Sequence, residues 1–137
     1  MKPKFRAWYV LAEEMINEIL MISFVRKEII GKFSDGSTSV PLKFEDKRNG
    51  EDVVLMQSTG LKDLNGVEIF EGDVVRQVRT QPTTENETIT GVVTMLEGAW
   101  LIMNDCEQLA SDLWSETDEN EIIGNIYENK DILEVKE

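Results

Sequence analysis

Short runs in which apolar and polar residues alternate dominate the hydrophobic pattern of this chain. Over residues 2–9, for example, Phe5, Ala7 and Tyr9 fall on one side of an extended backbone, as in a strand with one buried face. Because such runs are short, closely spaced and separated by glycine turns, they predict a mainly β fold, a small barrel or rolled sheet. Further strands are predicted over residues 25–33, 40–44, 53–56, 73–79, 88–96, 99–103 and 121–127.

Residues 59–75 form the corner around which these strands are arranged, and they hold three of the nine glycines. A glycine after a strand takes positive φ readily, an Asn-Gly dipeptide favours a tight turn, and the Glu-Gly-Asp sequence that follows is a second turn before an apolar strand. The predicted structural turn residues are Gly60, Asn65, Gly66, Gly72 and Asp73.

Residues 10–21 allow two interpretations. Leu11, Met15 and Ile19 have the i, i+4 spacing of an amphipathic helix. The alternative is a turn near residues 11–14 followed by a strand over 15–24, which the β-branched isoleucines permit. Two short helices are predicted later in the chain. One covers residues 105–114, where Asp105 and Gln108 have capping-box spacing, and the other covers residues 130–135.

A chain of 137 residues is long enough for one compact domain. Within it we expect an N-terminal β subregion, residues 1–52, that ends in a mobile polar loop over 47–51. Residues 53–137 are expected to form the barrel. No apolar run is long enough to span a membrane and no secretion signal opens the chain. The single cysteine, Cys106, agrees with a reducing compartment, so we expect a cytoplasmic protein.

The charge of the chain is unevenly distributed. The net charge is −13, residues 1–33 contribute +2, and residues 34–137 therefore contribute −15. A surface this negative repels phosphate backbones, so nucleic-acid binding is not expected outside the N-terminal piece. The acidic residues also have a simpler role, which is to keep a small protein soluble.

The absence of histidine limits the chemistry available. It excludes serine-histidine and cysteine-histidine catalysis and the commonest zinc sites. No phosphate-binding or dinucleotide-binding glycine motif occurs, so no cofactor and no metal are expected. Carboxylates gather at the corner, and a metal-dependent enzyme built from them is the least favoured hypothesis. These carboxylates belong to Asp63, Glu68, Glu71 and Asp73.

Two surfaces are candidates for binding a partner. Arg6 and Trp8 lie on a basic face with Lys2 and Lys4, which suits single-stranded nucleic acid, although edge strands also use such residues to block unwanted pairing. Asp112 and Trp114 belong to an acidic and aromatic stretch that could bind a basic partner, or could be a solvated face over the core. The apolar segment of residues 10–25 makes a homo-oligomer plausible.

Four sequence blocks, in order, resemble the signature blocks of the YopX family of bacteriophage and prophage proteins. The resemblance covers nearly the whole chain. It implies a small, mainly β protein with an SH3-like barrel in the host bacterium's cytoplasm, without an established activity, and it favours the hairpin over the helix at residues 10–21. The blocks are Lys4-Phe5-Arg6-Ala7-Trp8, Met56-Gln57-Ser58-Thr59-Gly60-Leu61-Lys62-Asp63 with Asn65-Gly66, Ile69-Phe70-Glu71-Gly72-Asp73-Val74-Val75, and Ile123-Gly124-Asn125-Ile126-Tyr127-Glu128-Asn129.

The sequence therefore predicts a non-enzymatic phage or prophage accessory protein that acts by binding another protein. The alternative is a nucleic-acid-associated module that uses the basic N-terminal strand.

Overall fold

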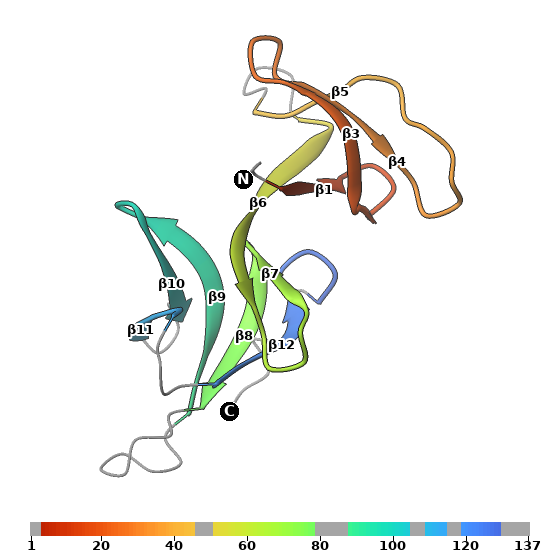
Figure 1. Cartoon of the computed structure of the whole chain (residues 1–137). Coiled ribbons are helices and arrows are strands. Elements are labelled where there is room, and N and C mark those ends of the chain that lie inside the picture. The colour runs from red at the N-terminus through yellow and green to blue at the C-terminus, as the bar shows by residue number, and fades with distance from the viewer. Residues whose placement is uncertain (1–3, 46–50, 79–87, 105–108, 115–118, 130–137) are drawn as a thin grey trace. The chain divides into compact units, whose positions relative to one another are not determined.

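A computed structural model describes residues 4–45, 51–78, 88–104, 109–114 and 119–129 of the chain (Figure 1). The mainly β fold is confirmed, because these residues form strands and the turns between them. No helix occurs among the described residues, and so none of them forms a helix long and apolar enough to cross a membrane. The strands are β1 (Phe5–Tyr9), β2 (Glu14–Ile16), β3 (Glu18–Ser23), β4 (Glu28–Lys32), β5 (Leu42–Lys43), β6 (Val53–Lys62), β7 (Glu68–Phe70), β8 (Asp73–Val78), β9 (Thr88–Leu96), β10 (Ala99–Asn104), β11 (Leu109–Asp112) and β12 (Glu119–Asn125).

The chain divides into two compact units, Met1–Gln57 and Ser58–Glu137, which are named here unit 1 and unit 2. The division falls within β6. The first half of β6 pairs with β1, and its second half pairs with β7.

Unit 1 contains two groups of antiparallel strands. In the first, β1 lies between β2 and β6, so that Ala7 is opposite both Ile16 and Leu55. In the second, the strand order is β3-β4-β5 (Figure 1). A turn over residues 10–13 joins β1 to β2, so the hairpin interpretation of residues 10–21 is confirmed and the helical one is wrong. The buried core consists of Ala7, Ile16, Ile29, Leu42, Phe44 and Val53.

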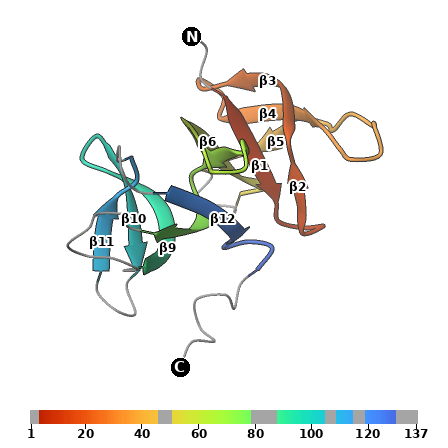
Figure 2. The same ribbon diagram turned by 60° about the horizontal axis from the view of Figure 1, so that its bottom comes forward.

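Unit 2 is built around a five-stranded antiparallel sheet of order β11-β10-β9-β8-β12, in which β9 is strongly curved (Figures 1 and 2). Gly91 in β9 lies against the neighbouring strand, because a Cβ placed there would be 2.6 Å from the carbonyl oxygen of Met103. Glycine is needed wherever two backbones approach this closely. The buried core consists of Ile69, Val75, Val93, Ile102 and Leu113.

The helix predicted over residues 105–114 is wrong where the structure describes it. Residues 109–112 form the strand β11, which pairs with β10 so that Leu101 is opposite Asp112. The i, i+4 spacing of Leu109 and Leu113 suggested a helix, but cross-strand hydrogen bonds to β10 determine the conformation of this segment. Three predicted features lie outside the described residues: the proposed capping residues 105–108, the loop 47–50 and the helix over 130–135.

Candidate functional site

The turn that follows β6 is held to β12 through the carboxylate of Asp63. Its Oδ1 accepts the backbone N–H groups of Asn65 and Val67, both at 2.9 Å. Its Oδ2 accepts the N–H of Ile122 in β12 at 3.1 Å. The backbone N–H of Leu64 also donates to the carbonyl of Asn120 at 2.9 Å. The Asn-Gly turn is therefore fixed against a strand that lies almost sixty residues away in the sequence.

The environment of Asp63 changes the pKa of its carboxyl group. Burial by itself raises this pKa, but the backbone N–H donors of Ile122, Val67 and Asn65 lower it, and the result is a pKa below the ordinary value. Asp63 is only 7% exposed. Because both of its oxygens accept backbone hydrogen bonds, this carboxylate organises the turn and is poorly placed to act as a general base.

The segment after β11 is held by the side chain of Gln77, which is fully buried in β8. Its amide nitrogen donates to the carbonyls of Asp112 at 3.1 Å and Leu113 at 3.3 Å, and to Oδ1 of Asn120 at 3.0 Å. Its amide oxygen accepts the hydroxyl of Ser111 at 2.9 Å. One glutamine therefore satisfies polar groups from two chain segments that flank the site.

Trp114 follows directly after this network and is 60% exposed. Its predecessor, Leu113, is fully buried in the core and donates its N–H to the carbonyl of Trp100. The chain at Trp114 is thus anchored on its N-terminal side while the indole faces solvent. An exposed, positioned tryptophan is typical of binding surfaces, because it offers a large apolar area at low entropic cost.

A hollow of about 450 Å³ lies beside Trp114, and we call it the Trp114 hollow. The turn contributes Leu64, which is 57% exposed, and β12 contributes the exposed Glu119. Lys62 also lines the hollow, so it carries one cation among its acids. The exposed Leu64 and Trp114 beside the Glu119 carboxylate suit an extended segment that carries a basic side chain. The remaining lining residues are Leu61, Asp63 and Asn120.

The net charge of the protein resides in unit 2. Residues 58–137 contain 5 Lys or Arg against 18 Asp or Glu, a net charge of −13, whereas residues 1–57 contain 9 of each. The Trp114 hollow is therefore part of the acidic unit, and unit 1 is neutral overall.

The sequence-predicted partner residues occupy two different environments. Asp112 and Trp114 are exposed on unit 2. Arg6 and Trp8 are buried in unit 1, with 9% and 6% of their surfaces exposed. The basic and aromatic face proposed for nucleic acid thus offers little of these two side chains to a ligand.

Three of the four carboxylates of the corner, those of Asp63, Glu68 and Asp73, form structural hydrogen bonds. Asp73 is 2% exposed and accepts the N–H of Phe70 at 2.8 Å, and Glu68 accepts the hydroxyl of Ser58. Among the described residues, no three acidic or cysteine side chains are grouped so that they could hold a metal ion. The turn glycines Gly66 and Gly72 have φ values of 83° and 91°.

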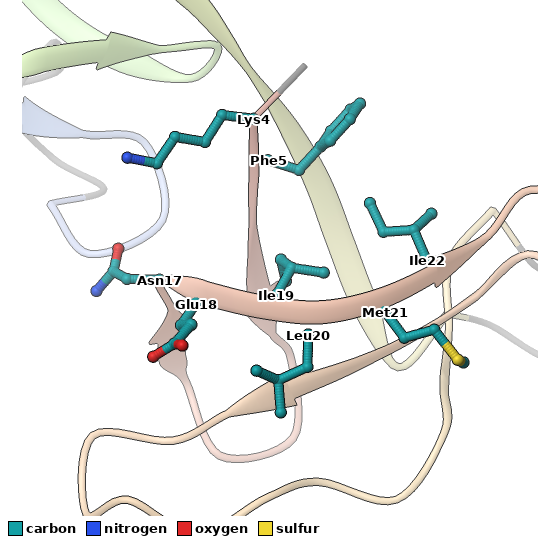
Figure 3. A pocket seen from close by; sticks show the side chains of 8 residues that line it. All are labelled: Lys4, Phe5, Asn17, Glu18, Ile19, Leu20, Met21 and Ile22. Atoms are coloured by element: carbon teal, nitrogen blue, oxygen red, sulfur yellow. The ribbon is translucent and has the colours of Figure 1, made fainter. Parts of the chain in front are cut away.

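Unit 1 has a hollow of its own, with a volume of about 640 Å³ (Figure 3). It is lined by Lys4 and Phe5 at the start of β1 and by the unbroken run of residues 17–22, which includes most of β3. Consecutive residues of a strand point to opposite faces. The hollow is lined by residues 17–22 without a gap, so residues from both faces of β3 reach it. It therefore runs along the edge of β3 as well as over one face.

Sequence reasoning missed the residues that shape the Trp114 hollow. Gln77 stands at a buried position of β8, two residues after the buried Val75. A polar residue at such a position was a usable signal of a buried network. Leu64 and Asn120 carry no comparable signal, since only the fold brings them beside Trp114.

In its described part this is a small protein whose regular elements are all strands, and its acidic unit 2 carries the Trp114 hollow. Comparison with known proteins then assigns its family. The model of the YopX protein family matches residues 4–134, so the chain belongs to the YopX family. A search of curated proteins finds no match.

Two solved structures are similar to nearly the whole chain. Protein EF1440 from Enterococcus faecalis is 27% identical, with a TM-score of 0.60, and the alignment covers 97% of this chain and 99% of that one. Protein yopX from Bacillus subtilis is 19% identical, with a TM-score of 0.61, and the alignment covers 94% and 96%. The second similarity concerns the fold alone.

Proposed function

We propose that this protein is a non-enzymatic binding module, which uses the Trp114 hollow of unit 2 to bind a basic segment of another protein. The observation that carries the proposal is the 60% exposure of Trp114 at a point where the chain is anchored by Leu113 and the Gln77 network. A tryptophan held outward in this way offers a partner a large, rigid apolar contact area.

Charge supports a basic partner. Unit 2 has a net charge of −13, and Glu119 lies at the hollow itself. A Lys or Arg side chain of the partner would stack on the indole of Trp114 and pair with the Glu119 carboxylate. Such a cation–π contact contributes about 0.5–2 kcal/mol, according to how well it is desolvated. Arginine is the better fit, because its planar guanidinium both stacks and forms paired hydrogen bonds.

The resemblance of the sequence blocks supports the biological setting that we propose, an accessory protein of a phage or prophage in the bacterial cytoplasm. The curvature of the five-stranded sheet in unit 2 supports an SH3-like barrel as its fold (Figure 2). An enzymatic role is not part of the proposal, because Asp63 and Asp73 use their carboxylates to bind backbone N–H groups.

The nucleic-acid alternative has less support. It depends on Arg6 and Trp8, which are mostly buried, and the acidic unit 2 repels phosphates. Tight, salt-sensitive binding of a single-stranded oligonucleotide would favour this alternative over a protein partner.

Isothermal titration calorimetry tests the proposal with a capped peptide of alternating Gly and Arg, and with a matched Gly and Gln peptide as a control. We expect the Arg peptide to bind, the Gln peptide not to bind, and the affinity to fall with salt. Trp114→Ala should weaken binding by about two- to thirtyfold. If the native protein binds neither peptide, or if Trp114→Ala binds as well as the native protein, the proposal is wrong.

Charge alone could also attract an Arg peptide, so a second pair of variants separates the hollow from the rest of unit 2. Glu119→Gln and Glu97→Gln remove the same charge, but Glu97 lies in the exposed β9–β10 turn. We expect Glu119→Gln to weaken binding more than Glu97→Gln. Equal effects would mean that the acidic unit attracts the peptide without using the hollow.

A further inference from the structure

β3 is an edge strand in the described part of the chain, and Lys4 and Phe5 at the start of β1 face it across a hollow. It stands at the end of the order β3-β4-β5, and in the described part of the chain no strand pairs with its other edge. The hollow in Figure 3 runs along this strand from Asn17 to Ile22. An open strand edge presents backbone donors and acceptors that can pair with another strand.

The other edge strands of the described residues are each protected. β2, β5 and β7 have three residues or fewer, and β11 has four and ends in Asp112. β12 is longer, but Asp63 and Leu64 bind the backbone of Asn120 and Ile122. Short strands, charges and covered edges are the usual means of preventing strand addition.

β3 lacks most of this protection. It has six residues and contains no Lys, Arg or Pro, and Glu18 at its start is its only charged residue. A β-bulge at Leu20 shifts its register against β4 between Ile19 and Met21. As a result, Ile19 and Ile22 pack on the core, while Leu20 and Met21 are 49% and 46% exposed (Figure 3).

We propose that the outer edge of β3 pairs with β3 of a second copy of this chain, antiparallel, across a two-fold axis between Leu20 and Met21. In that register, Leu20 lies opposite the second copy's residue 21 and Ile19 lies opposite its residue 22. Glu18 lies opposite a serine, so that no like charges face each other. The two exposed apolar side chains of each copy are brought together, and a two-fold interface of this kind closes at two subunits.

Two further observations favour a second copy over an unrelated strand. The chain as a whole has a net charge of −13, but residues 1–57 have 9 basic and 9 acidic side chains. Two copies of unit 1 can therefore meet without net electrostatic repulsion. The bulge at Leu20 also bends and twists the strand. A second copy of β3 has the same bend, whereas a straight strand would have to adapt to it.

Sedimentation velocity of the full chain over a range of concentrations tests the inference. We expect a species of twice the 15.6 kDa chain mass that dissociates on dilution. Met21→Lys should shift the equilibrium to the single chain. Leu96→Lys is the matched control, because Leu96 is also 46% exposed but lies in unit 2, and it should sediment like the native protein.

Hydrogen exchange of the native protein gives a second measurement that does not depend on a variant. Backbone amides of β3 should exchange more slowly at high concentration than at low concentration, while those of β10 should not change. Three results would each overturn the inference. The native protein could sediment as a single chain at every concentration, the Met21→Lys variant could self-associate like the native protein, or the exchange rate of the β3 amides could be independent of concentration.

Discussion

The carboxylate of Asp63 accepts the backbone N–H of Ile122 at 3.1 Å, although 59 residues separate them in the sequence. This hydrogen bond connects the turn after β6 to β12. The bond therefore positions Leu64 in the turn and Glu119 in β12 relative to each other, and both residues line the Trp114 hollow. The stability of unit 2 and the shape of the hollow both depend on this carboxylate.

Replacing Asp63 by Asn should destabilise the protein. The amide has one acceptor oxygen, so it cannot serve all three backbone donors, and a hydrogen bond to a charged group contributes about 1.5–3 kcal/mol. We expect a loss of about 2–4 kcal/mol in the free energy of unfolding, measured with urea. Asp35→Asn, at an exposed turn carboxylate that binds Ser37, is the control and should have a smaller effect. Equal losses would contradict the role assigned to Asp63.

The stabilisation by Asp63 should depend on pH. Its pKa is lowered in the folded protein, so the folded state holds fewer protons than the unfolded state in acid. The stabilisation is therefore fully present above the unfolded pKa of about 3.9 and is lost as pH falls through the lower, folded pKa. Urea unfolding from pH 6 down to pH 2 should show the difference between the native protein and Asp63→Asn shrinking as pH falls. A constant difference would contradict this account.

Gln77→Met should destabilise unit 2 more than Arg76→Met. Methionine has a similar length but removes the donor to the carbonyl of Asp112 and to Oδ1 of Asn120, and the acceptor of the Ser111 hydroxyl. The carbonyl of Leu113 keeps its hydrogen bond from the Asn120 amide, and the groups left unpaired cost about 1–3 kcal/mol. The neighbouring Arg76 forms an ion pair with Glu121 at the surface, where its side chain is 49% exposed, and such pairs contribute at most about 1 kcal/mol. Thermal unfolding of the two variants compares these effects directly, and the reverse order would refute the Gln77 network.

Gly91→Ala should be more destabilising than Gly31→Ala. At Gly91 the new Cβ would lie 2.6 Å from a backbone oxygen of Met103, whereas at Gly31 the nearest atom, at 2.5 Å, is a side-chain methyl of Ile16. A side chain can move aside more easily than a paired strand can, so Gly91→Ala should cost about 1–3 kcal/mol, with a smaller cost at Gly31. Urea denaturation of both variants measures the difference. A larger loss for Gly31→Ala would contradict the close approach of β9 and β10.

Local patterns revealed much of this fold. The strands predicted over residues 88–96 and 99–103 correspond to β9 and β10, because alternation and the Glu97-Gly98 turn point to the same hairpin. The prediction failed at β11, where Leu109 and Leu113 fit a helical spacing and only the neighbouring strand decides otherwise. β6 was predicted to end at Met56 but continues to Lys62, with Gly60 at φ 83° inside its irregular stretch.

The candidate site was only partly visible in the sequence. Trp114 and Asp112 stood out because they combine aromatic and acidic side chains in one short stretch, although a solvated face over the core explained that stretch equally simply. Arg6 and Trp8 looked equally promising, yet both faces of β1 are covered, since Arg6, Ala7 and Trp8 are all buried, and alternation alone did not reveal this. The contributions of Leu64 and Glu119 depend on long-range pairing, which no local pattern encodes.

An NMR titration of the native protein with the capped Gly and Arg peptide tests the central claim most directly. The indole N–H signals of the three tryptophans report separately on Trp8, which is 6% exposed, Trp100, which is partly buried, and Trp114, which is 60% exposed. We predict that the Trp114 signal shifts in a saturable way, together with the amides of residues 61–64 and 119–120, while the Trp8 signal stays in place. A titration in which the Trp114 signal does not move while the peptide binds would contradict the account.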